Sequence, residues 1–239
     1  MTSKLSDFTV RIFADGADKA GILQQYANPL IKGFTTNPTL MRKVGISDYE
    51  AFARDIVAHV PDRPISFEVF SDEFEEMYRQ AMKIKSWGAN VNVKIPVTNT
   101  RGESSVDLVR RLAGEGVKVN VTALFTIAQV EAVSAAIGNV EEAYISVFAG
   151  RIADAGIDPL PIMRQSLEIM SARTGQSLIW ASPRELLNVV QANDIGCQVI
   201  TVTNDILAKL GSIGKDLDEF SLDTVKMFYN DAASAGFAV

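Results

Sequence analysis

The sequence has very few of the residues on which many active sites depend. It contains one cysteine, Cys197, and one histidine, His59, among 239 residues. A single cysteine cannot form a disulfide within the chain, which fits a reducing cytoplasm. Cys197 lies in the apolar segment CQVITVT, so we expect it in the core. His59 has no second histidine or cysteine to join it, so neither a Ser-His-Asp triad nor a histidine-based metal site is predicted.

Positive charge and long apolar runs are scarce as well. Lysine and arginine total 23 against 29 acidic residues, a net charge of −6 without a basic block, so nucleic acid is not expected as a partner. The start, MTSKLSDFTVRIF, lacks the apolar stretch of a signal peptide, and no apolar run reaches the roughly 20 residues of a membrane span. These absences predict a soluble, cytoplasmic protein without a membrane partner, although a few local arginines still allow a small anionic substrate.

What the sequence has instead is a repeated unit, in which a short apolar, β-branched run precedes a helical pattern and a turn. Eight runs are predicted as strands: 9–15, 31–36, 65–70, 90–97, 117–124, 142–149, 176–182 and 197–203. Their nearly continuous apolar character is typical of parallel strands covered on both faces. Helical spacing is found in segments 71–88, 104–116, 125–138 and 182–194.

This alternation predicts a (β/α)8 TIM barrel, a single α/β domain over residues 1–239. A doubly wound open sheet is the alternative. Such a sheet usually carries a glycine-rich phosphate loop after its first strand. Here that strand continues into ADGADKAG, which lacks the GxGxxG spacing.

Polar residues recur at the predicted carboxyl ends of the strands, where the active sites of TIM barrels lie. Any one of them is an ordinary solvated strand end, whereas a ring of them is what a site at the barrel mouth needs. The ring comprises Asp15, Thr35, Thr36, Asn37, Glu68, Lys94, Asn120, Thr122, Ser146, Ser182, Thr201 and Thr203.

Lys94 is the most informative member of this ring because it interrupts the apolar strand NVNVKIPVT. Burial disfavours the ammonium form of a lysine and frees its amine to attack a ketone or aldehyde. The alternative is a lysine that reaches solvent from an edge strand or pairs with a carboxylate. Schiff-base chemistry also needs proton transfer, for which Asp15 and Glu68 are the candidates. Asp15 could instead cap the following helix, a role that Asp18 would fill equally well.

Two arginines follow the sixth and seventh predicted strands. Arg151 and Arg184, with Ser182 at an expected helix N-terminus, would clamp a phosphate by charge-assisted hydrogen bonds. TIM barrels often place phosphate groups near their last strands. For each arginine alone, a surface salt bridge is an equally good interpretation.

Several sequence strings carry a resemblance to a known family. In chain order they are ADGAD, GFTTNPTL, FEVF, VKIPVT, NVTALFT, SVFAGR and WASPRE, which span about residue 10 to residue 205. Together they resemble the transaldolase family, whose fold is a (β/α)8 barrel with a Schiff-base lysine on strand 4. Lys94 lies on the fourth predicted strand. GFTTNPTL and VKIPVT are specific in combination, whereas ADGAD alone is a weak signal.

The resemblance implies a role for each matching position. Lys94 corresponds to the Schiff-base lysine, Asp15 to the acid/base at the C4 hydroxyl, and Glu68 with Thr122 to the pair that holds the catalytic water. Implied substrate contacts come from Thr35, Asn37, Asn120, Ser146 and Phe148, and the implied phosphate site from Arg151, Ser182 and Arg184. No metal or organic cofactor is implied, because the iminium itself is the electron sink.

The implied activity is transfer of a three-carbon dihydroxyacetone unit from fructose 6-phosphate or sedoheptulose 7-phosphate to an aldose phosphate, in the pentose phosphate pathway. The family also contains short fructose-6-phosphate aldolases, which release free dihydroxyacetone. There the positions of Glu68 and Phe148 typically hold glutamine and tyrosine, so this chain is more similar to the transaldolases. ADGAD departs from the LDTAD or LDTSD of the short members, although both aspartates remain. A barrel that binds a sugar phosphate without catalysis is the alternative from another class.

The C-terminal segment LDTVKMFYNDAASAGFAV predicts a helix with apolar residues at Val225, Phe228 and Tyr229, followed by an apolar tail. In short members of the family such a helix packs on a neighbouring subunit in a pentamer or decamer. The resemblance therefore implies a homo-oligomer. A helix that covers its own barrel is the alternative.

Overall fold

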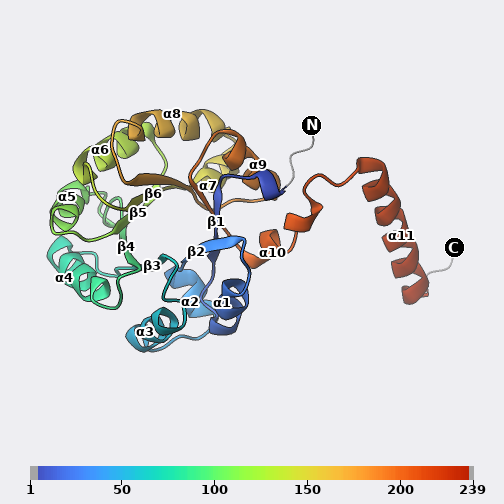
Figure 1. Ribbon diagram of the computed structural model, residues 1–239, viewed down its shortest axis with the longest axis horizontal. Coiled ribbons are helices and arrows are strands. Elements are labelled where there is room, and N and C mark those ends of the chain that lie inside the picture. The colour runs from blue at the N-terminus through green and yellow to red at the C-terminus, as the bar shows by residue number, and fades with distance from the viewer. Residues whose placement is uncertain (1–4, 237–239) are drawn as a thin grey trace.

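The chain folds into a closed barrel of parallel strands in the order β1 to β8 (Figure 1). The computed structural model describes residues 5–236, so the ends of the predicted domain, including the tail at 237–239, lie outside the described residues. The strands are β1 Arg11–Asp15, β2 Ile31–Thr35, β3 Ile65–Glu68, β4 Val91–Pro96, β5 Val119–Leu124, β6 Ala143–Val147, β7 Gln176–Trp180 and β8 Val199–Val202. The predicted strands and the TIM barrel are confirmed, and the doubly wound open sheet is wrong.

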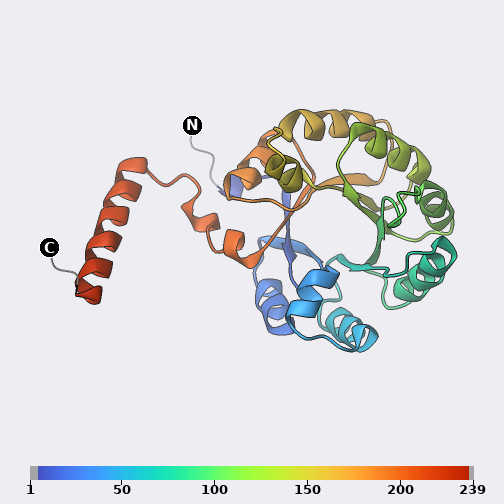
Figure 2. The ribbon, with the colours of Figure 1, turned by 180° about the vertical axis from the view of Figure 1, so that it is seen from behind.

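Helices surround the strands as an outer ring (Figures 1 and 2). They are α1 Lys19–Tyr26, α2 Pro38–Lys43, α3 Tyr49–His59, α4 Phe74–Lys85, α5 Val106–Gly114, α6 Ile127–Ile137, α7 Ala149–Asp154, α8 Leu160–Met170, α9 Leu187–Asp194 and α10 Asn204–Leu207. The helical patterns at 71–88, 104–116 and 125–138 correspond to α4, α5 and α6.

The predicted start of the helix at 182 is wrong. Ser182 has a φ of 59°, in the left-handed region, and α9 begins only at Leu187. Proline at 183 disfavours the helical conformation of the residue before it. Ser182 therefore lies in the loop after β7 and not at the N-terminus of a helix.

Alternate residues of each strand face the surrounding helices and the barrel interior. Phe13, Tyr144, Ile179 and Val199 form a separate buried cluster inside the barrel. A Cβ at Gly33 would lie 2.6 Å from the Phe13 ring, so glycine in GFTTNPTL makes room for that ring. This cluster fills the interior of the barrel. The inward-facing polar residues lie above it, at the carboxyl ends of the strands, and meet at one mouth of the barrel.

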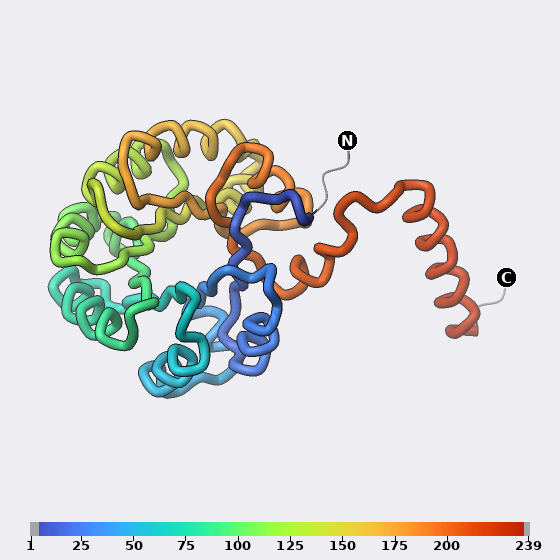
Figure 3. The backbone as a smooth tube through the Cα atoms, in the orientation of Figure 1, coloured from blue at the N-terminus to red at the C-terminus, as the bar shows by residue number. Residues whose placement is uncertain are grey.

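The last helix, α11 Leu217–Ala235, stands apart from the barrel, and the tube in Figure 3 follows the chain from β8 out to it. None of its described residues is buried. Its large exposed apolar side chains are Leu217, Phe220, Leu222, Val225, Met227, Phe228 and Tyr229. The alternative in which this helix covers its own barrel is therefore wrong.

Three smaller expectations concern single residues and the membrane. Cys197 is buried, as predicted, and burial raises the pKa of its thiol to about 12. His59 is the last residue of α3 and lies beside Asp55 on the surface. Within residues 5–236, no helix combines the length and the apolar character needed to cross a membrane.

Candidate active site

A cavity of about 720 Å³ opens at the carboxyl ends of the strands. It collects eleven of the twelve residues for which the family resemblance implies a catalytic or substrate-binding role, from seven different strands or the segments that follow them. Those that line it are Asp15, Thr35, Asn37, Glu68, Lys94, Thr122, Ser146, Phe148, Arg151, Ser182 and Arg184. The exception, Asn120, is fully buried below Ser146 and donates no group directly to the cavity wall.

Lys94 reaches the cavity from the middle of the closed sheet, with 9% of its side chain exposed. Its Nζ donates to the carbonyl oxygen of Thr36 at 2.9 Å and lies 3.3 Å from Oε2 of Glu68. Glu68 and Lys94 are register partners on β3 and β4, which explains why their side chains meet. The alternative of a lysine that reaches solvent from an edge strand is wrong. The other alternative, a lysine paired with a carboxylate, does hold: Lys94 pairs with Glu68, which the sequence also suggested as a proton carrier.

Asp15 occupies the end of β1 inside a set of hydrogen bonds. Its carboxylate accepts from Thr35 Oγ1 at 2.8 Å and from Asn37 Nδ2 at 3.3 Å. Asn37 is oriented because its Oδ1 accepts from the N–H of Leu40 and so caps α2. Burial raises the pKa of Asp15, while the charge of Lys94 and the bond from Thr35 act in the opposite direction. A raised pKa suits a carboxylate that must both accept and return a proton.

The helix-capping alternative for Asp15 is wrong, because Asp18 caps α1. The carboxylate of Asp18 accepts from the N–H of Gly21 at 2.7 Å. Asp15 is therefore free to act in the cavity.

A buried polar chain supports the floor of the cavity beside Lys94. Ser146 Oγ donates to Asn120 Oδ1 at 2.7 Å, and Asn120 Nδ2 donates to Ser66 Oγ at 3.0 Å. Asn120 is the register partner of Lys94 on β5. Asn120 therefore orients Ser146, which does line the cavity.

Thr122 carries a hydroxyl that is not used by the fold. Its Oγ1 is buried and makes no hydrogen bond to any other residue in the range 5–236. Thr122 lines the cavity. Since buried polar groups normally have a partner, this hydroxyl has hydrogen-bonding capacity left for a substrate or a water.

Backbone strain is concentrated at the same mouth. Ala123, with a φ of 62°, and Ser182, with a φ of 59°, are the non-glycine residues of the described chain in the left-handed region, and both line the cavity. The β5–β6 register is interrupted between Val121 and Leu124, on either side of Ala123. Such conformations cost on the order of 1–3 kcal/mol and are found preferentially at functional sites.

The predicted phosphate clamp is built on two segments in close contact, α7 and the loop after β7. A Cβ at Gly150 would lie 1.5 Å from the carbonyl oxygen of Ser182, so only glycine allows this approach. Arg184 forms a two-pronged ion pair with Asp154 of α7, with Nε 2.9 Å from Oδ1. The salt-bridge interpretation thus holds for Arg184. Arg151, whose guanidinium lies 5.8 Å from the Phe148 ring, has no carboxylate within 4.0 Å among the residues described.

Comparisons with known proteins identify the family of this chain. The family model described as "Transaldolase/Fructose-6-phosphate aldolase" matches residues 12–239. The chain belongs to this family. It is 34% identical over 202 residues to a "Probable transaldolase" of Dehalococcoides mccartyi, a match that covers 84% of this chain and 90% of the relative. A protein of the same description from Lactiplantibacillus plantarum is 33% identical over 220 residues, covering 90% and 96%.

More distant solved structures share the fold only. The crystal structure of 2,3-dimethylmalate lyase, a member of the PEP mutase/isocitrate lyase superfamily, superposes with a TM-score of 0.56 at 14% identity, covering 98% of this chain and 86% of the other. Family membership, rather than this likeness, makes the protein an enzyme of the transaldolase and aldolase kind.

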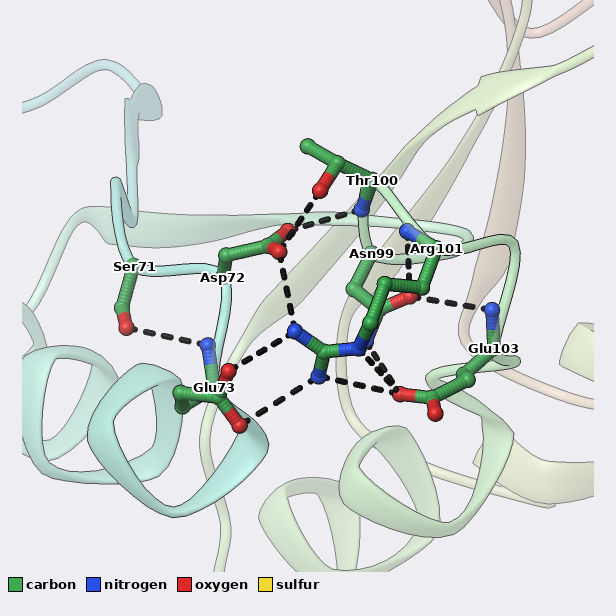
Figure 4. A network of polar contacts seen from close by, with 7 residues as sticks. All are labelled: Ser71, Asp72, Glu73, Asn99, Thr100, Arg101 and Glu103. Atoms are coloured by element: carbon green, nitrogen blue, oxygen red, sulfur yellow. Dashed lines mark hydrogen bonds and ion pairs between the residues drawn. The ribbon is translucent and has the colours of Figure 1, made fainter.

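Polar contacts link the segments that follow β3 and β4 to each other (Figure 4). Arg101 is the centre of the network, with ion pairs to Glu73 at 2.8 Å and to Glu103 at 3.0 Å. Asp72 accepts from the N–H of Thr100 at 2.7 Å. Each exposed pair contributes little alone, but the network joins the ends of two strands that carry family motifs.

Tyr49, Gly150 and Asp154 contact site residues and were absent from the sequence prediction. Gly150 could have been found from the motif SVFAGR, since glycine inside a motif often marks a close approach of two backbones. Nothing in the local sequence points to Tyr49 or Asp154, because their partners, Glu68 and Arg184, lie 19 and 30 positions away in the chain.

Proposed function

We propose that the protein is a transaldolase that transfers a dihydroxyacetone unit from fructose 6-phosphate or sedoheptulose 7-phosphate to an aldose phosphate. The observation that carries the proposal is the buried amine of Lys94, 3.3 Å from Glu68, in a cavity that also contains Asp15. An amine between a carboxylate and a carbonyl oxygen, shielded from solvent, is placed for attack on a ketone.

In the proposed reaction the nitrogen of Lys94 adds to the C2 carbonyl of the ketose and forms a carbinolamine. Glu68, through a water held with Thr122, protonates the departing hydroxyl, and loss of water gives the iminium. Asp15 then takes the proton of the C4 hydroxyl as the C3–C4 bond breaks. The bonding electrons move into the iminium, so that an enamine stays on Lys94 and an aldose phosphate leaves.

The second half of the reaction is the reverse sequence with a new aldehyde. Its carbonyl carbon is attacked by the enamine, its oxygen receives the proton held by Asp15, and hydrolysis of the iminium releases the new ketose. Thr35 and Asn37 support the carboxylate of Asp15, while Ser146, which Asn120 orients from below the cavity wall, contacts a hydroxyl of the three-carbon unit. Because the iminium accepts the electrons, the scheme uses no metal or organic cofactor.

The proposed phosphate site lies on α7 and the loop after β7. Arg151 and Arg184 carry the positive charge, and Ser182 offers a hydroxyl. The Asp154 pair orients the guanidinium of Arg184, and Arg151, which has no carboxylate partner within residues 5–236, supplies charge to the anion. Two arginines on one side of the cavity favour substrates with a single terminal phosphate.

An aldolase that releases free dihydroxyacetone is the second candidate, since the family includes both activities. Glu68 and Phe148 favour transfer. The Phe148 ring packs 5.8 Å from that of Phe125 and, unlike the tyrosine typical of the aldolases, has no hydroxyl with which to hold a water that would protonate the enamine or hydrolyse the iminium.

Acceptor dependence separates the two candidates. Fructose 6-phosphate is incubated with and without an aldose phosphate acceptor, and Lys94→Met is the inactive control. Transfer predicts sustained turnover only with the acceptor. Sustained release of dihydroxyacetone without acceptor would identify an aldolase instead. Ligand binding without turnover by wild type, unchanged in Lys94→Met, would identify a barrel that only binds sugar phosphates.

The remaining proposals concern the setting of the enzyme. We propose a role in the pentose phosphate pathway of the cytoplasm, with residues 1–239 forming one unit. The unpartnered apolar face of α11, including Val225 and Phe228, supports packing on a second copy of the chain in a pentamer or decamer.

A further inference from the structure

The hydroxyl of Tyr49 bridges both backbone polar groups of Glu68. It accepts from the Glu68 N–H at 2.8 Å and donates to the Glu68 carbonyl oxygen at 3.0 Å. Tyr49 is the first residue of α3, which precedes β3 on the outside of the barrel (Figure 1). A side chain from outside the sheet therefore occupies the place of a neighbouring strand.

The β2–β3 ladder stops just before this point. The register pairs are Phe34 with Ile65 and Thr35 with Ser66, and the last bond runs from the Thr36 N–H to the Ser66 carbonyl at 3.2 Å. In a parallel ladder a residue directs its N–H and C=O to the same neighbouring strand. The carbonyl of Thr36 would accept next from the N–H of Glu68.

That bond is replaced by two others. The N–H of Glu68 is taken by Tyr49, and the carbonyl of Thr36 accepts instead from Nζ of Lys94 at 2.9 Å. The exchange leaves every one of these polar groups with a partner. The carbonyl of Thr36 therefore has no strand donor to share it, and both of its lone pairs are available to the Lys94 amine.

Packing fixes the Tyr49 ring in this position. Its centroid lies 4.5 Å from that of Phe70, 5.5 Å from that of Trp87 and 6.1 Å from that of Phe67. Burial raises the pKa of Tyr49 well above its usual range. The hydroxyl therefore keeps its proton and can donate to the Glu68 carbonyl while accepting from the N–H.

We propose that Tyr49 is a positioning residue that holds the end of β3 away from β2, so that Glu68 stays beside Lys94 and the Thr36 carbonyl stays free to orient the Lys94 amine. The proposal rests on the proposed Schiff-base function. Tyr49 touches no substrate and acts through the backbone of Glu68. Removal of its hydroxyl leaves a donor and an acceptor without partners, and closure of the ladder at Thr36 would satisfy the donor.

The test is Tyr49→Phe, which keeps the ring and removes both hydrogen bonds. The rate of formation of the borohydride-trapped adduct with fructose 6-phosphate is measured in wild type and variant. Affinity for the same ketose phosphate is measured in the Lys94→Met background, with and without the Tyr49 substitution. Tyr78→Phe is the matched control, because Tyr78 loses a hydrogen bond to Glu115 on the exposed side of α4. Thermal unfolding checks that each variant is folded.

The trapping rate of Tyr49→Phe should fall by about tenfold or more, because a buried donor loses its partner beside the reacting amine. Affinity in the Lys94→Met background should stay unchanged, since the arginine clamp lies on α7 and the loop after β7, away from Tyr49. Tyr78→Phe should match wild type. An unchanged trapping rate would overturn the role of Tyr49 and leave the proposed function intact. A parallel loss of trapping, affinity and thermal stability would overturn it too, as a merely structural effect. Absence of any adduct in wild type would overturn the proposed function itself, and this role with it.

Discussion

Gly150→Ala tests how the arginine clamp is built. A Cβ at this position would lie 1.5 Å from the Ser182 carbonyl oxygen and 3.3 Å from Nε of Arg184. Since Cβ contacts below 3.0 Å essentially do not occur, the gap must open by at least 3.0 − 1.5 = 1.5 Å. The atom in the way belongs to the backbone, so no side-chain rotation relieves the contact. Either α7 or the loop after β7 must move.

Because Arg151 lies on α7 and Arg184 on the loop after β7, either movement changes the distance between the two arginines. A misplacement of about 1 Å can cost about 100-fold in rate, so kcat/KM for the phosphorylated ketose should fall by about that factor. The loss should appear mainly in KM, whereas turnover of an unphosphorylated ketose should change little. Overpacking of this kind destabilises the fold by about 1–3 kcal/mol, so the variant should remain folded for assay.

Steady-state kinetics with both ketoses provides the measurement, and Gly114→Ala is the matched control. Gly114 ends α5, and a Cβ there meets nothing within 4 Å. The control should keep wild-type kinetics and gain up to about 1 kcal/mol of helix stability. If Gly150→Ala kept the KM of the wild type for the phosphorylated ketose, the close contact at Gly150 would not position the arginine clamp.

Two further predictions concern stability and assembly. Burial raises the pKa of Asp15 above that of an ordinary aspartate, so the native state binds this proton more tightly than the unfolded state, and ionised Asp15 destabilises the fold at neutral pH. Asp15→Asn should therefore raise the free energy of urea unfolding at pH 7. The gain should shrink as the pH falls towards 3.8 and below, where the aspartate is protonated in both states. A variant that is less stable than wild type at pH 7 would contradict the expected gain. Phe228→Ser, on the exposed face of α11, should lower the molar mass found by size exclusion with light scattering, and a monomeric wild type would refute the assembly.

Sequence periodicity was sufficient for the barrel because parallel strands buried on both faces give continuous apolar runs. A polar residue inside such a run must then face either the helices or the mouth, which pointed to Glu68 and Lys94 as candidates; that the two are register partners on β3 and β4 was seen only in the structure. It could not select Tyr49. That contact depends on where the β2–β3 ladder stops, which is a property of strand register rather than of local composition.

The loop after β7 illustrates a second limit. A serine before an apolar helical pattern predicts a helix start, yet Ser182 precedes Pro183 and adopts a φ of 59°. The strain is compensated by contact with Gly150, and the pairing of Arg184 with Asp154 joins residues 30 positions apart. Such tertiary contacts override the local signal, so the arginines could be predicted but their framework could not.

The central claim is that Lys94 forms a Schiff base with a ketose phosphate. The most direct measurement is borohydride reduction during incubation with fructose 6-phosphate, followed by proteolysis and mass spectrometry of the modified peptide. We expect a reduced three-carbon adduct on Lys94, within the peptide that contains NVNVKIPVT, and none in Lys94→Met. An adduct on another lysine, or none under conditions in which the enzyme turns over, would contradict it.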